Sequence, residues 1–189
     1  DIMFSSFAEN AGRNERPFIR TDRPIPRAWP DPTALSHVLD IIRKAERPLI
    51  IGGHGVWWAR AETALEKVGK ALFLPVFNVP YHSKLLGEES EAYMGLADFH
   101  QYHPSKEAIL EADVVIMVGG RLDNQMNFGN PPFFQKETTL ICVNGSHEEL
   151  DYNRAADELL LSDPGAFFKA LMGIGKTWDS WFTLQKQRR

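Results

Sequence analysis

Short apolar runs alternate with amphipathic segments along the central part of the chain. Within the runs, Val, Ile and Leu follow one another with few polar residues, which is typical of strands buried on both faces of a sheet. Strands are predicted over 47–55 (RPLIIGGHG), 71–79 (ALFLPVFNV), 113–120 (DVVIMVGG), 138–144 (TTLICVN) and 158–163 (ELLLSD). A long loop containing Gly87 and Gly95 is expected after the second of these strands.

Apolar residues at helical spacing lie on either side of the first predicted strand. The two apolar faces consist of Leu35, Val38, Leu39 and Ile42, and of Ala61, Ala64, Leu65, Val68 and Leu72. A short helix is expected over 103–112, and Asp163 followed by Pro164 begins another that ends near Gly173. This alternation predicts an α/β fold, a doubly wound and mostly parallel Rossmann-like sheet with helices on both faces.

The two ends of the chain differ from this central pattern. Residues 17–32 hold five of the 12 prolines, and proline fixes φ and lacks an N–H, so this stretch should be an extended linker. The chain begins with Asp1 instead of Met, and aromatic residues at helical spacing in 177–189 need a surface to pack against. We therefore expect part of a longer protein. It comprises a linker from a preceding domain (1–33), a central nucleotide-binding-like α/β domain (34–173), and the start of a linker helix to a following domain (174–189).

Composition narrows the class of protein. A chain of 189 residues that is 43% hydrophobic, with a net charge of only −4, should fold as one domain. No apolar run approaches the roughly 20 residues of a membrane span, and mild acidity argues against a nucleic-acid partner. The single cysteine, Cys142, excludes a disulfide framework and a cysteine-based zinc site. Its place in a predicted strand indicates an inert core thiol in a reducing compartment, so a cytoplasmic location is expected.

Each predicted strand ends in small or turn-forming residues. The carboxyl ends of parallel strands face one crevice, where ligands of open α/β sheets bind, and glycine lets a phosphate approach backbone N–H groups. Turns also need Gly, Asn and Asp for purely structural reasons. Five such turns together nevertheless favour a binding site. They are 52–55 (GGHG), 78–80 (NVP), 119–124 (GGRLDN), 144–146 (NGS) and 163–164 (DP).

The turns do not match the dinucleotide fingerprint of a dehydrogenase. Trp58 stands where the third glycine of that motif belongs, and Asn78 stands where an acidic residue usually binds the ribose. Arg121 suits a phosphate or an adenine ring, or else forms a salt bridge with a nearby carboxylate. His54 contacts a phosphate or donates to a backbone carbonyl, and the sequence leaves this choice open.

Two further residue pairs have simple structural interpretations. His100 and His103 have metal-ligand spacing but no evident third ligand, so a solvated pair is favoured and no metal site is predicted. Trp57 and Trp58 are expected to pack beneath a neighbouring segment at the start of a helix. No nucleophile elbow, phosphate-loop lysine or Cys–His pair is present, so no catalytic residue is assigned.

The apolar runs and the strand-end turns that follow them, taken in their order along the chain, resemble the central domain of thiamine-diphosphate-dependent enzymes. The nearest group is the acetohydroxyacid synthase and 2-oxoacid decarboxylase or carboligase family. The similarity covers roughly residues 34–173. It rests on the Gly-Gly-Arg-Leu-Asp-Asn element after a strand, together with the spacing between a Pro-Val pair and a later Met-Gly pair.

The resemblance implies three α/β domains, with thiamine diphosphate and magnesium between the first and third, outside this segment. It implies flanking pyrimidine- and diphosphate-binding domains in the same chain, a homodimer or homotetramer, and no catalytic residue in the central domain. In this family the central domain holds FAD, ADP or nothing. The residues matching the nucleotide contacts are Arg27, Gly52, Gly53, His54, Val79, Pro80, Leu96, Ala97, Gly119, Gly120, Arg121, Asp123, Asn144, Gly145, Asp163 and Pro164.

Several positions depart from the pattern of flavin-binding relatives. Residues 77–80 (FNVP) replace a threonine-rich turn, Leu96-Ala97 replaces His-Gly, Gln125 replaces a second arginine, and Asn144 replaces an acidic residue. These departures favour a weakly bound nucleotide or none. The leading hypothesis is the central domain of a lyase or carboligase acting on 2-oxoacids. The alternative is a spacer module that binds no nucleotide, and an NAD-linked deacetylase-like domain is disfavoured.

Overall fold

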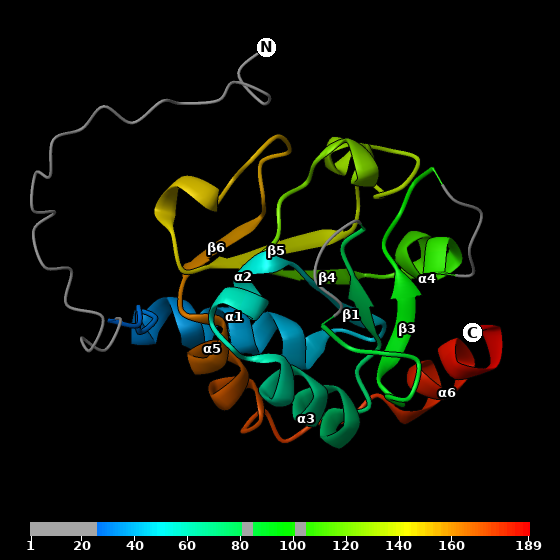
Figure 1. Ribbon diagram of the computed structural model, residues 1–189, viewed down its shortest axis with the longest axis horizontal. Coiled ribbons are helices and arrows are strands. Elements are labelled where there is room, and N and C mark those ends of the chain that lie inside the picture. Colours follow the sequence, from blue (N-terminus) through cyan, green and yellow to red (C-terminus); the bar gives the residue numbers. More distant parts are fainter. Residues whose placement is uncertain (1–25, 81–84, 101–104) are drawn as a thin grey trace, which may run out of the picture.

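Six parallel strands form one sheet in the order β3-β2-β1-β4-β5-β6 (Figure 1). The computed structural model describes residues 26–80, 85–100 and 105–189. The strands are β1 (Pro48–Gly52), β2 (Val76–Asn78), β3 (Tyr93–Leu96), β4 (Val114–Val118), β5 (Thr139–Asn144) and β6 (Glu158–Leu161). Every neighbouring pair is parallel, so the predicted fold class is confirmed.

Helices connect the strands and flank the sheet. They are α1 (Pro32–Lys44), α2 (His54–Trp58), α3 (Glu62–Leu72), α4 (Ser105–Glu111), α5 (Pro164–Leu171) and α6 (Asp179–Arg188), with 3₁₀ turns η2 (Asn124–Gly129) and η3 (His147–Glu149). The chain moves outward from β1 through α3 to β2, and back from β3 through α4 to β4. Because such crossovers are right-handed, α3 and α4 cover opposite faces (Figure 1).

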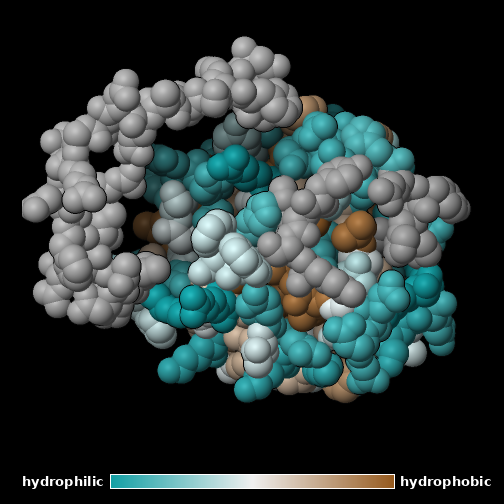
Figure 2. Space-filling model, in the orientation of Figure 1, coloured by the Kyte–Doolittle hydropathy of each residue, from teal (hydrophilic) through white to brown (hydrophobic). Residues whose placement is uncertain are grey.

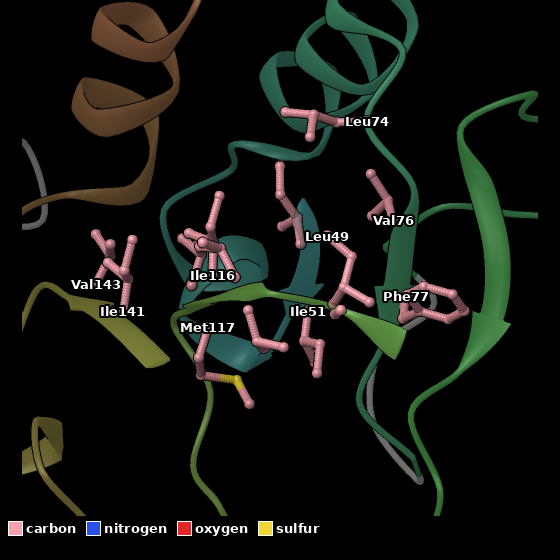
Figure 3. Close-up of a cluster of buried hydrophobic side chains, with 14 of the residues drawn as sticks. Leu49, Ile51, Leu74, Val76, Phe77, Ile116, Met117, Ile141 and Val143 are labelled. Carbon is pink, nitrogen blue, oxygen red and sulfur yellow. The ribbon is translucent and has the colours of Figure 1, made fainter. Parts of the chain in front are cut away.

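The core lies on both sides of the two central strands. All five residues of β1 and of β4 are buried, as expected for strands covered on both faces. Consecutive residues alternate between the faces, and in Figure 3 Ile116 and Met117 of β4 point to opposite sides. Polar residues cover most of the described surface on the side shown in Figure 2, with a few hydrophobic residues exposed between them.

The structure differs from the predicted elements in two places. The predicted loop after Pro80 contains the edge strand β3, whose four residues include Gly95 and give little strand signal. The predicted strand 71–79 is divided, because α3 continues to Leu72 and ends at Phe73 in the left-handed conformation (φ 53°). Only Val76–Asn78 then pair in the sheet.

The aromatic residues of the C-terminal segment pack on this domain. The indole N–H of Trp178 donates to the Ala45 carbonyl at 2.8 Å, and that of Trp181 donates to the Pro48 carbonyl at 2.9 Å. Phe182 is also buried and meets Phe73 edge to face at 5.6 Å. These rings therefore pack on residues of the chain itself, whereas their sequence pattern led us to expect a neighbouring domain as their packing surface.

Cys142 is a core residue of β5 and is 8% exposed. Burial raises the pKa of its thiol to about 12, so the thiolate is scarce at neutral pH. The prediction that Cys142 lies in the core is confirmed. In the part of the chain that the structure describes, no helix combines the length and apolarity needed to cross a membrane.

Candidate functional site

A cleft of about 1630 Å³ opens at the carboxyl ends of β1, β4, β5 and β6. It lies where the strand order reverses, because the chain leaves β1 toward one edge of the sheet and continues from β4 toward the other. Such a switch point is where open α/β sheets bind ligands. The predicted site residues that line the cleft are Arg27, His54, Val79, Gly119, Gly120, Arg121, Asp123, Asn144, Gly145, Asp163 and Pro164.

Two glycine turns touch each other at the base of this cleft. The N–H of Gly53 donates to the Val118 carbonyl at 2.9 Å, and the N–H of Gly55 donates to the Gly119 carbonyl at 2.8 Å. A Cβ at Gly53 would lie 2.4 Å from Gly120 Cα, closer than atoms can approach. Gly119 also has a positive φ of 63°, which disfavours a side chain. The glycines thus allow backbone contact between the turns after β1 and β4.

Five of the predicted residues are not among those lining the cleft. Gly52 lies within β1, where an added Cβ would meet Leu85 Cδ1 at 2.7 Å, and Gly53 contacts the turn after β4. Pro80 is buried, and the remaining two residues, Leu96 and Ala97, lie at the end of β3. The predicted residues that follow β4, β5 and β6 therefore line the cleft, whereas most of those that follow β2 and β3 do not.

Arg121 is held at the cleft by an acidic partner from the next connection. Its guanidinium donates through Nε and Nη2 to the two carboxylate oxygens of Glu149. This contact raises the pKa of Arg121 and lowers the pKa of Glu149, and the hydrogen bonds are the main cause of both shifts. The guanidinium also lies 5.5 Å from the Tyr152 ring centroid. The salt-bridge interpretation of Arg121 is therefore confirmed, although the side chain still borders the cleft.

A second arginine reaches the cleft from the segment before α1. Arg27 Nη1 lies 3.3 Å from Asp163 Oδ1, and the same oxygen accepts the N–H of Ala166 at 3.1 Å. Asp163 is thus the N-cap of α5, as its position before Pro164 predicted. The backbone N–H of Asp163 also donates to the Ala28 carbonyl at 2.7 Å. These contacts fix Arg27 beside the start of α5.

Four exposed aromatic residues that the sequence did not predict line the cleft and form an aromatic rim. Trp57 and Trp58 line it and are 43% and 75% exposed, so the expectation that they pack beneath a neighbour is wrong. Phe128 and Tyr152 line it as well and are 46% and 50% exposed. The one available signal was the position of the two tryptophans directly after a strand-end glycine turn.

A metal site finds no support within residues 26–80, 85–100 and 105–189. No group of three or more His, Cys, Asp or Glu side chains there has the geometry to hold an ion. His100 Nε2 lies 3.0 Å from the Asn124 carbonyl, while His103 falls outside the described residues.

The strand order and the cleft define a Rossmann-like α/β domain with a ligand-sized opening at its switch point. Residues 35–171 match the family model described as "Thiamine pyrophosphate enzyme, central domain", and the chain belongs to this family. The resemblance inferred from the sequence is therefore confirmed. By its description, this family comprises the central domains of thiamine diphosphate enzymes.

The chain is similar in sequence to a 2-hydroxyacyl-CoA lyase and to an acetolactate synthase. The chain is 28% identical over 149 residues to 2-hydroxyacyl-CoA lyase 1 of Mus musculus, covering 79% of this chain and 24% of that protein. It is 29% identical over 179 residues to the acetolactate synthase large subunit IlvG of Mycobacterium tuberculosis, covering 94% of this chain and 30% of that protein. The chain thus spans less than a third of the length of these relatives.

A solved structure has the same fold. Benzoylformate decarboxylase from Polynucleobacter necessarius superimposes with a TM-score of 0.68 at 18% identity, over 86% of this chain and 30% of that one.

Proposed function

We propose that this chain is the nucleotide-binding central domain of a thiamine-diphosphate-dependent lyase or carboligase that acts on 2-oxoacids or related acyl donors. Membership of the central-domain family supports the enzyme class. The similarity to a 2-hydroxyacyl-CoA lyase supports a lyase, and the similarity to an acetolactate synthase supports a carboligase. Thiamine diphosphate and magnesium are bound by flanking domains of the same chain. The whole protein forms a homodimer or homotetramer and is cytoplasmic. This chain contributes binding and positioning, and none of its residues is assigned a catalytic role.

The cleft supports an adenine nucleotide with a diphosphate as the bound group. The turn of Gly119 and Gly120 presents backbone at the cleft without side chains, which suits the close approach of a phosphate. Arg27 and Arg121 both line the cleft and carry positive charge there, and Asp123 offers a carboxylate that can accept from ribose hydroxyls. The residues thus fit ADP or the adenosyl half of FAD. The observation that carries the proposal is this combination of glycine backbone and arginines at the switch point.

Absorption and calorimetry test the proposal on the purified protein. We expect either a nucleotide released by heating, or saturable binding of ADP at one site when the protein is free of it. A flavin absorption band would assign the cleft to FAD, and released ADP without flavin would assign it to the smaller nucleotide. If ADP, FAD and coenzyme A all fail to bind, the alternative of a spacer module without nucleotide replaces the proposal.

Removing the charge of Glu149 should strengthen nucleotide binding. Glu149 holds Arg121 at the cleft, so a phosphate must compete with this carboxylate and is repelled by it. For a partly exposed ion pair of this kind, Glu149→Gln should lower the Kd for ADP about three- to fivefold. Because Arg121 holds the pKa of Glu149 below its ordinary value, the carboxylate stays charged at pH 6–8 and the difference should persist across that range.

Glu148→Gln is the matched control for this variant. Glu148 is adjacent to Glu149 in sequence, is exposed, and is not among the residues lining the cleft. Its substitution by Gln therefore removes the same charge without freeing Arg121. Its Kd for ADP should equal that of the unaltered protein in calorimetric titration. A Glu149→Gln variant that binds ADP no more tightly than this control would refute the competition between Glu149 and phosphate.

A further inference from the structure

We infer that Trp57, Trp58 and Arg60 form a stacking platform for the base of the nucleotide bound in the cleft. The inference rests on the proposed function and adds to it a binding surface outside the glycine turns. Trp57 and Trp58 belong to α2, Arg60 follows it, and all three side chains line the cleft. The ligand class is a nucleotide, which combines a planar aromatic base with anionic phosphates.

Both tryptophans expose aromatic surface that would ordinarily be buried. Trp58 is 75% exposed and Trp57 is 43% exposed, whereas Trp178 and Trp181 are only 4% and 5% exposed. Trp57 and Trp58 meet edge to face, with ring centroids 4.7 Å apart and planes at 72°. In this geometry only one ring gives a face to the contact, so ring faces remain open to a planar ligand. Stacking on such a face suits any nucleotide base.

The platform stands on a rigid base. An added Cβ at Gly55 would lie 2.7 Å from Gly119 Cα, so α2 begins in direct backbone contact with the turn after β4. The N–H of Ala59 donates to the Gly55 carbonyl at 3.0 Å, which completes the single turn of helix carrying Trp57 and Trp58. The backbone that carries Trp57 and Trp58 is therefore fixed against the turn after β4 before any ligand binds, which lowers the cost of ordering on binding.

Arg60 is an arginine of the cleft whose guanidinium forms no ion pair within the described residues. Arg27 and Arg121 are engaged by Asp163 and Glu149, whereas Arg60 forms no ion pair with any residue in the described ranges. Its backbone is left-handed (φ 52°), a conformation that is unfavourable for a side-chain-bearing residue. Its N–H donates to the Trp57 carbonyl at 2.9 Å, so this turn keeps the Arg60 backbone next to α2, and its side chain lines the same cleft as the two rings. A guanidinium there can pair with a phosphate or lie flat on a base.

Calorimetric titration with ADP tests the platform. Losing one base-stacking ring should weaken ADP binding about tenfold in Trp58→Ala, while Trp58→Phe should keep most of the affinity. Trp29→Ala is the matched control, because Trp29 is 64% exposed but is not among the residues lining the cleft, and its Kd should not change. ADP should also quench tryptophan fluorescence, and this quenching should diminish in Trp58→Ala.

Two further measurements separate stacking from other effects. Inorganic pyrophosphate carries the charge of the ligand without a base, so Trp58→Ala should bind it as the unaltered protein does. Arg60→Gly relieves the positive φ, so it should weaken ADP binding without lowering the thermal unfolding midpoint.

If ADP binds the unaltered protein and Trp58→Ala with equal Kd, the platform is refuted and the proposed function stands. If ADP, FAD and coenzyme A bind neither protein, the nucleotide proposal itself fails and the platform fails with it.

Discussion

Gly53→Ala should lower the free energy of unfolding by about 3 kcal/mol or abolish folding, the largest effect we expect from adding one methyl group. The new Cβ would lie 2.4 Å from Gly120 Cα and 2.5 Å from the Gly119 carbonyl oxygen. Both are backbone atoms, so no side chain can rotate to make room. Relief requires separating the turns after β1 and β4, which would break the Gly53 N–H to Val118 carbonyl bond. Urea unfolding followed by circular dichroism measures the loss.

Gly145→Ala provides the comparison for this prediction. Gly145 also lies in a strand-end turn at the cleft, but its added Cβ would meet nothing closer than the Ser162 carbonyl oxygen at 3.9 Å. Its φ is not in the left-handed region, so the free energy of unfolding should change by less than about 0.5 kcal/mol. Equal stability of the two variants would contradict the close contact at the base of the cleft.

These two glycines show where sequence reasoning about the site reaches its limit. Composition correctly placed glycine turns after the strands, because such turns follow from local chemistry. The sequence pattern favoured a ligand site for the five turns taken together. In the structure Gly53 is required by the turn after β4, while Gly145 has room for a side chain. Which turns touch depends on the pairing of strands far apart in the chain, and no local pattern records that pairing.

The fold itself was largely predictable for a different reason. The buried strands β1, β4 and β5 are continuous apolar runs, and the apolar faces of α1 and α3 repeat at helical spacing. These patterns reflect burial directly. The edge strand β3 was missed because its four residues are held by one neighbour, β2, and include a glycine. Its strand character comes from the tertiary contact more than from its own residues.

The charges and aromatic rings of the cleft were the least predictable features. Arg121 was recognised as a site residue, but its partner Glu149 lies 28 positions later and no spacing rule connects them. Trp57 and Trp58 were assigned to the interior because large aromatic residues are usually well buried. Their exposure follows from the position of α2 at the mouth of the cleft. Residues that break the burial rule are thus the ones that the structure adds to the candidate site.

Trp181→Ala should lower the free energy of unfolding by about 3–5 kcal/mol. The family match ends at residue 171, yet the Trp181 ring is only 5% exposed and its indole N–H donates to the carbonyl of Pro48, the first residue of β1. Truncation would remove this hydrogen bond and leave a cavity under α6. Trp181→Phe should cost less, because it keeps most of the ring and loses the N–H. Urea unfolding followed by circular dichroism is the measurement, since it does not depend on tryptophan fluorescence.

Leu184→Ala tests whether the effect belongs to the packed face of α6. Leu184 lies on the same helix but is 37% exposed, so its truncation should cost less than about 1 kcal/mol. A large difference between the two variants would make α6 an integral part of the domain, with any connection to a following domain beginning beyond its buried face. A small cost for both would mean that α6 is held only weakly by this domain. The interpretation of 174–189 as the start of a linker helix would then be the better one.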